Sequence, residues 1–391
     1  MVSESDAEID ETSSRNAFKP DTFPRVAVTA AVLTISSLLA YVPAPGLSPA
    51  AIAHLATATD DSATVAMSQL SIVALGLSPI LSVLIAAEFL KLAAPPLYGL
   101  EDNPSRTHKF NRAVLILGLF LAAFQAYGVT TALEDLGSNG IPLIEEPGTL
   151  FRLSYMLTLV AGVALTYWLA EIITRHGIGS GFWVVLLAGE IGSFPNVVKH
   201  LAANHAIGQI STAEMLSLVI VIAAALLSIV ALYRLRVTPA DSRTSVSRLA
   251  ARDIMMPPLL GLAIASALMM AAPLWQFLTR DDTTPAYSFD PAHPVRLIVG
   301  AAMILLIAYL RAVTRPLRGL ASAQAIRWSF IVGAIAAAIT VALEITSARA
   351  GINFISGTWL IILIMVCLVF LSAQREQPAS ERADVATGAG K

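Results

Sequence analysis

The chain has 391 residues, of which 56% are hydrophobic and 13% are charged, and its formal net charge is −2. Soluble domains carry about 25% charged residues, so this composition excludes an ordinary soluble protein and indicates an integral membrane protein. The single cysteine, Cys367, excludes an internal disulfide framework.

Both ends of the chain are polar. The first 24 residues are acidic and lack the basic start and the small-residue cleavage site of a secretory signal. The last 18 residues are rich in small and polar side chains. Such segments bury too little apolar surface to fold, so we expect residues 1–24 and 374–391 to form disordered cytoplasmic tails.

Long apolar windows between these tails predict ten membrane spans, because a span needs about 20 mostly apolar residues. Proline, glycine or charged residues bound each window. In chain order, the predicted spans are 26–42, 67–91, 113–133, 151–173, 181–198, 213–233, 254–278, 295–313, 328–347 and 355–373.

Basic residues give an independent test of this count. With the N-terminus inside, 20 of the 25 lysines and arginines fall in segments assigned to the cytoplasm, which is the bias that the positive-inside rule requires. One missed span would invert every later loop and remove the bias. We therefore expect ten spans with both termini cytoplasmic.

The halves 25–207 and 208–373 each hold five predicted spans, so they would enter the membrane from opposite sides. This is an inverted repeat, in which a site lies at mid-depth between the halves. The predicted fold class is an all-α polytopic membrane protein with ten transmembrane helices in two inverted five-helix halves.

The second predicted span contains two features that an ordinary apolar helix lacks. Gly76 and Pro79 predict a break in the helix, which lipid tolerates only where protein or a water-filled cavity covers the freed backbone groups. Nearer its inner end, Glu88 and Lys91 are three residues apart, a spacing that predicts a structural salt bridge along one helix face.

The join of the fourth and fifth predicted spans, ITRHGIGSGF (173–182), carries three glycines. Because only a short segment separates these spans, the chain must reverse tightly, and Gly177, Gly179 and Gly181 supply backbone angles that other residues resist. The alternative is a cluster of helix-packing glycines. We favour the turn, because packing alone does not explain why the glycines coincide with a reversal.

A single acid lies within the fifth predicted span. Glu190 follows Gly179 by eleven residues, which is roughly 16 Å of helix and about half of a ~30 Å hydrocarbon core. An acid at that depth should face the bundle interior or water. One interpretation is a carboxylate that lines an aqueous passage, and the other is a hydrogen bond between helices without a role in transport.

Several motifs in the same order resemble the SecY family, the central subunit of the bacterial protein-conducting channel. They are VPAPG (42–46), ALGLSPILS (74–82), FQAYG (124–128), LAEIITRHGIGSGFWVVLLAG (169–189) and PLW (273–275). The resemblance extends over roughly 24–375. It implies a clam-shell of two five-helix halves around an hourglass pore, with a lateral gate between spans 2–3 and 7–8.

Residue by residue, the resemblance implies a pore ring of mostly aliphatic side chains, which closes by dewetting. Its positions are Leu81, Ile85, Leu186, Glu190, Ile264 and Ile362. The acid departs from the family, since a charge in the ring weakens an ion seal. The resemblance also implies lateral-gate residues and basic residues that dock a cytoplasmic partner. These are Ser82, Gln125 and Ser266 for the gate, and Arg234, Arg236, Arg311, Arg315 and Arg318 for docking.

Two regions are shorter than the family pattern. MSQLSIV (67–73) is interpreted as a reduced plug or as no plug at all. The inner loop between spans 8 and 9 is also short, which weakens docking, and arginines at an inner membrane surface are otherwise orientation anchors.

The resemblance implies a channel for secretory and membrane proteins in the bacterial inner membrane, and not an enzyme. It implies SecE-like and SecG-like small subunits, SecA or the ribosome, unfolded secretory polypeptides and the lipid bilayer as partners. We expect no cofactor, metal or nucleic acid. The alternatives are an accessory paralogue with few clients and a secondary transporter in which Glu190 titrates at the midplane.

Overall fold

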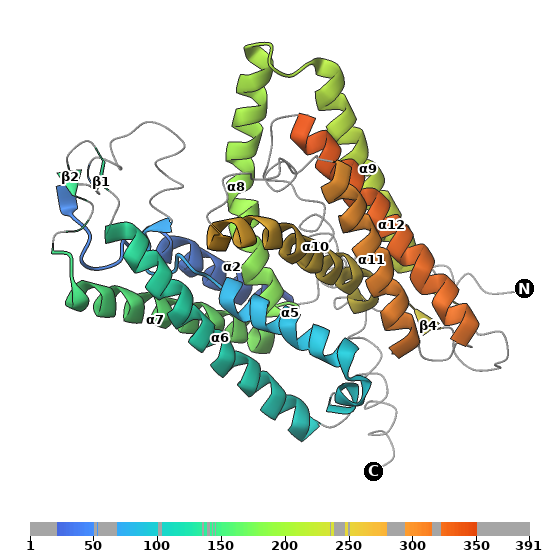
Figure 1. The fold of residues 1–391 in the computed structure, drawn as a ribbon, viewed down its shortest axis with the longest axis horizontal. Coiled ribbons are helices and arrows are strands. Elements are labelled where there is room, and N and C mark those ends of the chain that lie inside the picture. The colour runs from blue at the N-terminus through green and yellow to red at the C-terminus, as the bar shows by residue number, and fades with distance from the viewer. Residues whose placement is uncertain are drawn as a thin grey trace, which may run out of the picture. The chain divides into compact units, whose positions relative to one another are not determined.

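The computed structural model is predominantly helical (Figure 1). It describes residues 22–50, 53, 69–100, 104–134, 137–138, 141–142, 144, 146–234, 236–237, 247–248, 251–279, 294–314 and 322–349. Contacts divide these residues into two compact units. The first unit holds 22–79 and 119–189, and the second unit holds 80–118 and 190–349.

The described α-helices follow the predicted spans closely. They are α2 (Thr22–Leu39), α5 (Ser78–Ala93), α6 (Pro104–Glu134), α7 (Thr149–His176), α8 (Gly181–Ala206), α9 (Thr212–Arg234), α10 (Ala251–Thr279), α11 (Pro294–Thr314) and α12 (Ser322–Arg349). Each of the first nine predicted spans overlaps one of these helices, and the tenth, 355–373, lies outside the described residues. Helix α2 begins inside the predicted tail 1–24, whose other residues, like 374–391, are also outside the described part.

Short elements connect some of the helices. A 3-10 helix, η1 (Pro95–Leu100), follows α5. The strands β1 (Gly137–Ser138) and β2 (Ile141–Pro142) pair antiparallel between α6 and α7. The strands β3 (Arg236–Val237) and β4 (Ser247–Arg248) pair antiparallel between α9 and α10.

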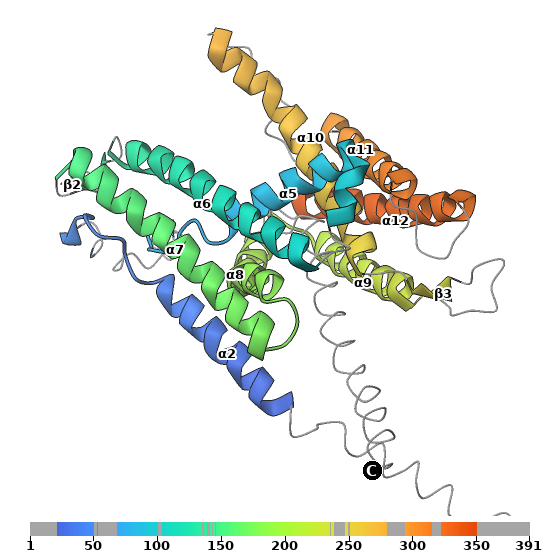
Figure 2. The ribbon, with the colours of Figure 1, turned by 90° about the horizontal axis from the view of Figure 1, so that it is seen from below.

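In the first unit, α2 lies beside α7 (Figure 2). A buried cluster contains Phe151, Tyr155 and Leu159 of α7 together with Ala44 and Leu47 from the segment after α2. The start of α7 is also tied to the end of α6, because Arg152 donates from Nε to Glu134 at 2.8 Å and the same carboxylate accepts the backbone N–H of Gly148. Packing and an ion pair therefore both fix this helix.

In the second unit, α11 packs on α10 and α12, and α12 also packs on α9 (Figure 1). Small residues permit these close contacts. A Cβ added at Gly261 would lie 2.6 Å from the Cα of Ile304, and one added at Gly333 would lie 2.6 Å from the Cβ of Ala308. Small residues at helix crossings are typical of membrane bundles, because they let the backbones approach.

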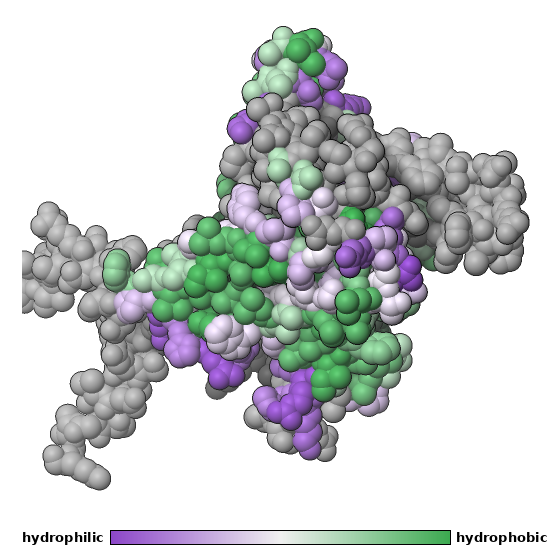
Figure 3. Space-filling view, turned by 90° about the vertical axis from the view of Figure 1, so that its left-hand side faces the viewer, coloured by the Kyte–Doolittle hydropathy of each residue, from purple (hydrophilic) through white to green (hydrophobic). Residues whose placement is uncertain are grey.

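Five helices in the described residues are long and apolar enough to cross a membrane. They are His108–Glu134, Thr149–His176, Thr212–Leu232, Pro294–Thr314 and Ile326–Arg349. Large apolar side chains such as Phe120, Phe124 and Leu227 remain exposed, and hydrophobic residues gather into broad patches on the face in Figure 3. Such a surface suits lipid rather than water, so the prediction of a helical membrane protein is confirmed.

Candidate functional site

The helix break predicted in the second span is confirmed. Helix α5 begins at Ser78, with Pro79 as its second residue, where the missing N–H of proline is harmless. Gly76 has a φ of +50°, a left-handed conformation that favours glycine. The predicted start of this span at residue 67 was wrong, because Leu70 and residues 72–77 form turns rather than helix.

Protein covers the backbone freed by this break, as the prediction requires. The segment pairs with the chain after α2, since Ala44 donates its N–H to Leu70 at 3.0 Å and Ile72 donates to Val42 at 3.0 Å. The carbonyl oxygen of Ile72 also lies against Gly162 of α7, at the place where a Cβ of that residue would stand. The turn is therefore held in the first unit by contacts to two segments, the chain after α2 and helix α7.

The glycine-rich join between α7 and α8 is a tight reversal of four residues, 177–180. Only Gly179 has a left-handed backbone, with a φ of +76°. Gly177 has an extended conformation with a φ of −99°, and Gly181 is the first residue of α8. The expectation that all three supply unusual angles was therefore wrong for Gly177 and Gly181.

Close packing explains the other two glycines. A Cβ at Gly177 would lie 2.6 Å from Oγ1 of Thr29, and one at Gly181 would overlap the carbonyl oxygen of Ala170. The turn interpretation is therefore correct for Gly179, and the packing interpretation is correct for Gly177 and Gly181. Two threonine hydroxyls complete the reversal: Thr29 accepts the N–H of Ile178 at 3.0 Å, and Thr174 accepts that of Gly181 at 2.9 Å.

The predicted salt bridge of α5 is confirmed, and it is buried. Lys91 Nζ lies 3.0 Å from Glu88 Oε1, with both side chains at most 3% exposed. Lys91 also lies 4.4 Å from the ring centroid of Phe110 on α6, a distance suited to a cation–π contact. From α11, Arg311 Nη1 lies 3.7 Å from Glu88 Oε2.

This buried charge cluster, Glu88, Lys91 and Arg311, joins two helices that are far apart in the sequence. A buried charge must be paired, since removing one partner costs about 3–5 kcal/mol. The three-residue spacing of Glu88 and Lys91 predicted the ion pair within α5. It gave no sign of Arg311, because that contact depends on how α11 packs in the second unit.

The residues predicted to form a pore ring lie on three of the described helices. Leu81 and Ile85 are half-buried, one turn apart on α5, while Leu186 on α8 and Ile264 on α10 are also half-buried. Glu190 lies on α8, and the prediction about its side chain falls outside the described part, as does Ile362 entirely. Their convergence on one constriction stays a prediction.

The SecY family model matches residues 71–318, which is more than half of the chain. The chain belongs to the SecY family. A relative named protein translocase subunit SecY from Aquifex aeolicus is 31% identical over 202 residues, 49% of this chain and 47% of that protein. Another with that name from Rickettsia conorii is 30% identical over 188 residues, 46% and 43% of the two chains. The chain thus spans about half the length of the curated relatives it matches.

Solved structures agree with this membership at the level of the fold. One of these is a SecY structure that was reported in a study of how its plug domain stabilises the closed state of the channel. It superposes on this chain with a TM-score of 0.58 at 12% identity, over 92% of this chain and 93% of that one. Sec61 from a canine ribosome–channel complex gives 0.57 at 13% identity with the same coverage. At such low identity the similarity shows the fold alone.

SecY membership does not make every predicted docking arginine available. Arg311 is 6% exposed and paired with Glu88, so the structure contradicts its docking role. Arg234 ends α9 and Arg236 lies in β3, whereas Arg315 and Arg318 fall outside the described residues. Docking through these four stays a prediction.

The three predicted lateral-gate residues of this SecY chain lie on three helices. Ser82 on α5 and Ser266 on α10 are exposed, and Gln125 on α6 is half-buried. Their role in a lateral gate stays a prediction. Within the described part of the chain, no group of three His, Cys, Asp or Glu residues could hold a metal ion.

Proposed function

We propose that this SecY-family chain is a channel subunit that moves secretory proteins across the bacterial inner membrane and inserts membrane proteins into it. The observation that carries the proposal is the family match over residues 71–318. That stretch contains the helix break before α5, the glycine reversal and the buried charge cluster. The relatives that share it are named translocase subunits.

The proposed channel has ten spans in two inverted halves with both termini in the cytoplasm. The excess of basic residues in the segments assigned to the inside supports this orientation. Five of the six proposed ring positions are aliphatic. Such a ring passes any sequence without polar recognition and closes when water leaves it.

The channel would work with other proteins, because the sequence carries no nucleotide-binding loop to supply energy. SecE-like and SecG-like small subunits would surround it within the bilayer. SecA or a ribosome would deliver unfolded polypeptides from the cytoplasm. This partner would dock on the basic segments near Arg234 and Arg236.

Site-specific crosslinking tests the channel. A photoreactive residue at Ile85 or Ile264 is expected to capture a stalled secretory chain, because both positions would line the pore. The matched control is the same probe at Leu227 on α9, which is 67% exposed and would face lipid. Equal capture at all three positions, or capture at Leu227 alone, would refute the channel.

A specialised paralogue with few clients is the second candidate. The burial of Arg311 favours a specialised paralogue, because a buried arginine cannot contact a docking partner and the docking region is already short. A standard channel should replace the essential copy in a depletion strain, whereas a specialised paralogue should bind a SecE-like subunit and fail to support growth. We do not propose the transporter alternative, because the family match includes Glu190 and the relatives are named translocase subunits.

A further inference from the structure

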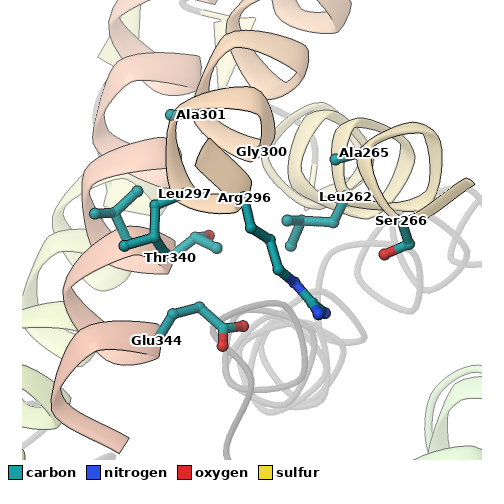
Figure 4. A pocket seen from close by; sticks show the side chains of 10 residues that line it. Leu262, Ala265, Ser266, Arg296, Leu297, Gly300, Ala301, Thr340 and Glu344 are labelled. Carbon is teal, nitrogen blue, oxygen red and sulfur yellow. The ribbon is translucent and has the colours of Figure 1, made fainter. Parts of the chain in front are cut away.

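A cavity opens between α10, α11 and α12 in the second unit (Figure 4). Its volume is about 140 Å³, roughly ten times the space that a single water requires. Leu262 and Leu297 contribute apolar walls, and Ser266 lies at the edge. The cavity therefore has room for a group of several heavy atoms with both apolar and polar parts.

Two opposite charges enter this cavity from neighbouring helices. Arg296 of α11 and Glu344 of α12 are both half-buried, and Figure 4 shows their side chains directed into the same space with their charged ends apart. Guanidinium binds phosphate in a planar, two-pronged geometry. A carboxylate accepts about four hydrogen bonds, so Glu344 can take an ammonium group in addition to partners within the protein.

The depth of the two charges indicates the ligand. Arg296 is the third residue of α11, and Glu344 lies five residues before the end of α12. At 1.5 Å per residue these positions are roughly 3 Å and 8 Å from the helix ends. The polar zone of a bilayer occupies about 5–8 Å on each side of the hydrocarbon core, so both charges lie near the level of lipid head groups.

We propose that this cavity binds the head group of a zwitterionic phospholipid that carries a primary ammonium, such as phosphatidylethanolamine. Arg296 holds the phosphate, Glu344 holds the ammonium, and the apolar walls accept the glycerol and upper acyl chain. An anion alone would satisfy Arg296 but would be repelled by Glu344. A zwitterion accounts for both residues, and this inference stands independently of the proposed channel activity.

Lipid titration of the purified full-length chain, read by native mass spectrometry, tests the proposal. Phosphatidylethanolamine is expected to bind more tightly than phosphatidylglycerol. Glu344→Gln should weaken phosphatidylethanolamine binding about tenfold, the equivalent of one charge-assisted hydrogen bond, and should strengthen phosphatidylglycerol binding, because the repelling carboxylate is gone. Arg296→Gln should weaken the binding of both lipids.

The exposed pair Glu171 and Arg175 on α7 provides matched controls, and Glu171→Gln and Arg175→Gln should leave lipid binding unchanged. Equal affinity for the two lipids, or a phosphatidylethanolamine preference that survives Glu344→Gln, would overturn the proposal. Inorganic phosphate that displaces the lipid at low millimolar concentration would identify a simple phosphate site and would overturn it too.

A second measurement needs no variant and so does not depend on whether a variant folds. Stepwise N-methylation of the lipid, from phosphatidylethanolamine to phosphatidylcholine, removes the ammonium N–H donors one by one. The affinity of the wild-type chain should fall with each methyl group. An affinity that stays constant through the series would overturn the assignment of Glu344 to the ammonium.

Discussion

The two reversals on either side of α8 have similar lengths but are held in different ways. Between α7 and α8, Gly177 and Gly181 lie in contact with Thr29 and Ala170, where no Cβ fits. Between α8 and α9, Gly208 has a φ of +75°, and a Cβ added there would meet nothing within 4 Å. The first turn depends on tertiary packing, and the second on local backbone preference.

Helix capping differs between the two turns as well. In the first turn, a hydroxyl from α2 holds the N–H of Ile178. In the second, Ser211 and Glu214 bond each other's backbone N–H groups, with Ser211 N to Glu214 Oε2 at 2.8 Å and Glu214 N to Ser211 Oγ at 3.2 Å. This capping box needs no residue outside its own helix. Substitutions should therefore be more damaging in the first turn.

Gly181→Ala should have the largest effect of the substitutions that test this difference. Its Cβ would overlap the carbonyl oxygen of Ala170, a backbone atom, so α7 and α8 would have to separate. We expect a loss of about 3 kcal/mol or more in unfolding free energy, measured by denaturation in detergent. Gly189→Ala on the same helix is the control, since nothing lies within 4 Å of it, and it should be neutral or stabilising by up to about 1 kcal/mol. Equal losses would mean that packing does not hold this turn.

Thr29→Val should have the next largest effect. It removes the acceptor of the buried Ile178 N–H, and an unsatisfied buried donor costs about 1–3 kcal/mol. Thr29→Ser keeps the hydroxyl and should lose less than about half as much, in the same denaturation measurement. If the valine and serine variants were equally stable, the hydrogen bond from α2 would not matter to the reversal.

Ser211→Ala tests the locally capped turn. Loss of a serine N-cap costs about 1 kcal/mol, and thermal unfolding should shift accordingly. Glu214→Gln retains an acceptor for the Ser211 N–H and should be milder, because glutamine also forms capping boxes. A loss at Ser211 as large as that at Gly181 would remove the distinction between the two turns.

Gly208→Asn should have the smallest effect. Asparagine tolerates a left-handed backbone, and the space around Gly208 is open. We expect a change below about 1 kcal/mol in unfolding free energy. Gly208→Val should be clearly worse, since β-branched residues resist a positive φ. Similar losses for asparagine and valine would show that steric contact, not backbone conformation, governs this position.

Local sequence patterns predicted most of the helices and the break before α5. Apolar windows located α7 and α11 to within a few residues, and the pair of Gly76 and Pro79 located the break, because both signals act within a few residues of chain. Hydropathy failed at residues 70–77, which are apolar enough for part of a span but form turns and, at Ser71, a β-bridge to Pro43. Their backbone partners, residues 42–44 and Gly162, are set by tertiary packing.

The candidate site shows the same division between local and distant causes. The spacing of Glu88 and Lys91 revealed their pairing. Neither the hydroxyl of Thr29 nor the guanidinium of Arg311 was identified as a partner, because each arrives from a helix distant in the sequence. The cavity with Arg296 and Glu344 was missed for that reason too. The sequence does hold one signal for it, because an arginine and an acid lie near the ends of successive predicted spans.

The buried charge cluster also constrains the order in which the protein is made. Glu88 and Lys91 neutralise each other within α5, so that helix can enter a bilayer early. Arg311 emerges later, by roughly 10–45 s at usual rates of synthesis, and a buried charge without its partner costs about 3–5 kcal/mol. The guanidinium of Arg311 in α11 can be paired only when α5, which is synthesised earlier, is already in place. The N-terminal helices therefore act as a template for the packing of the helices synthesised later.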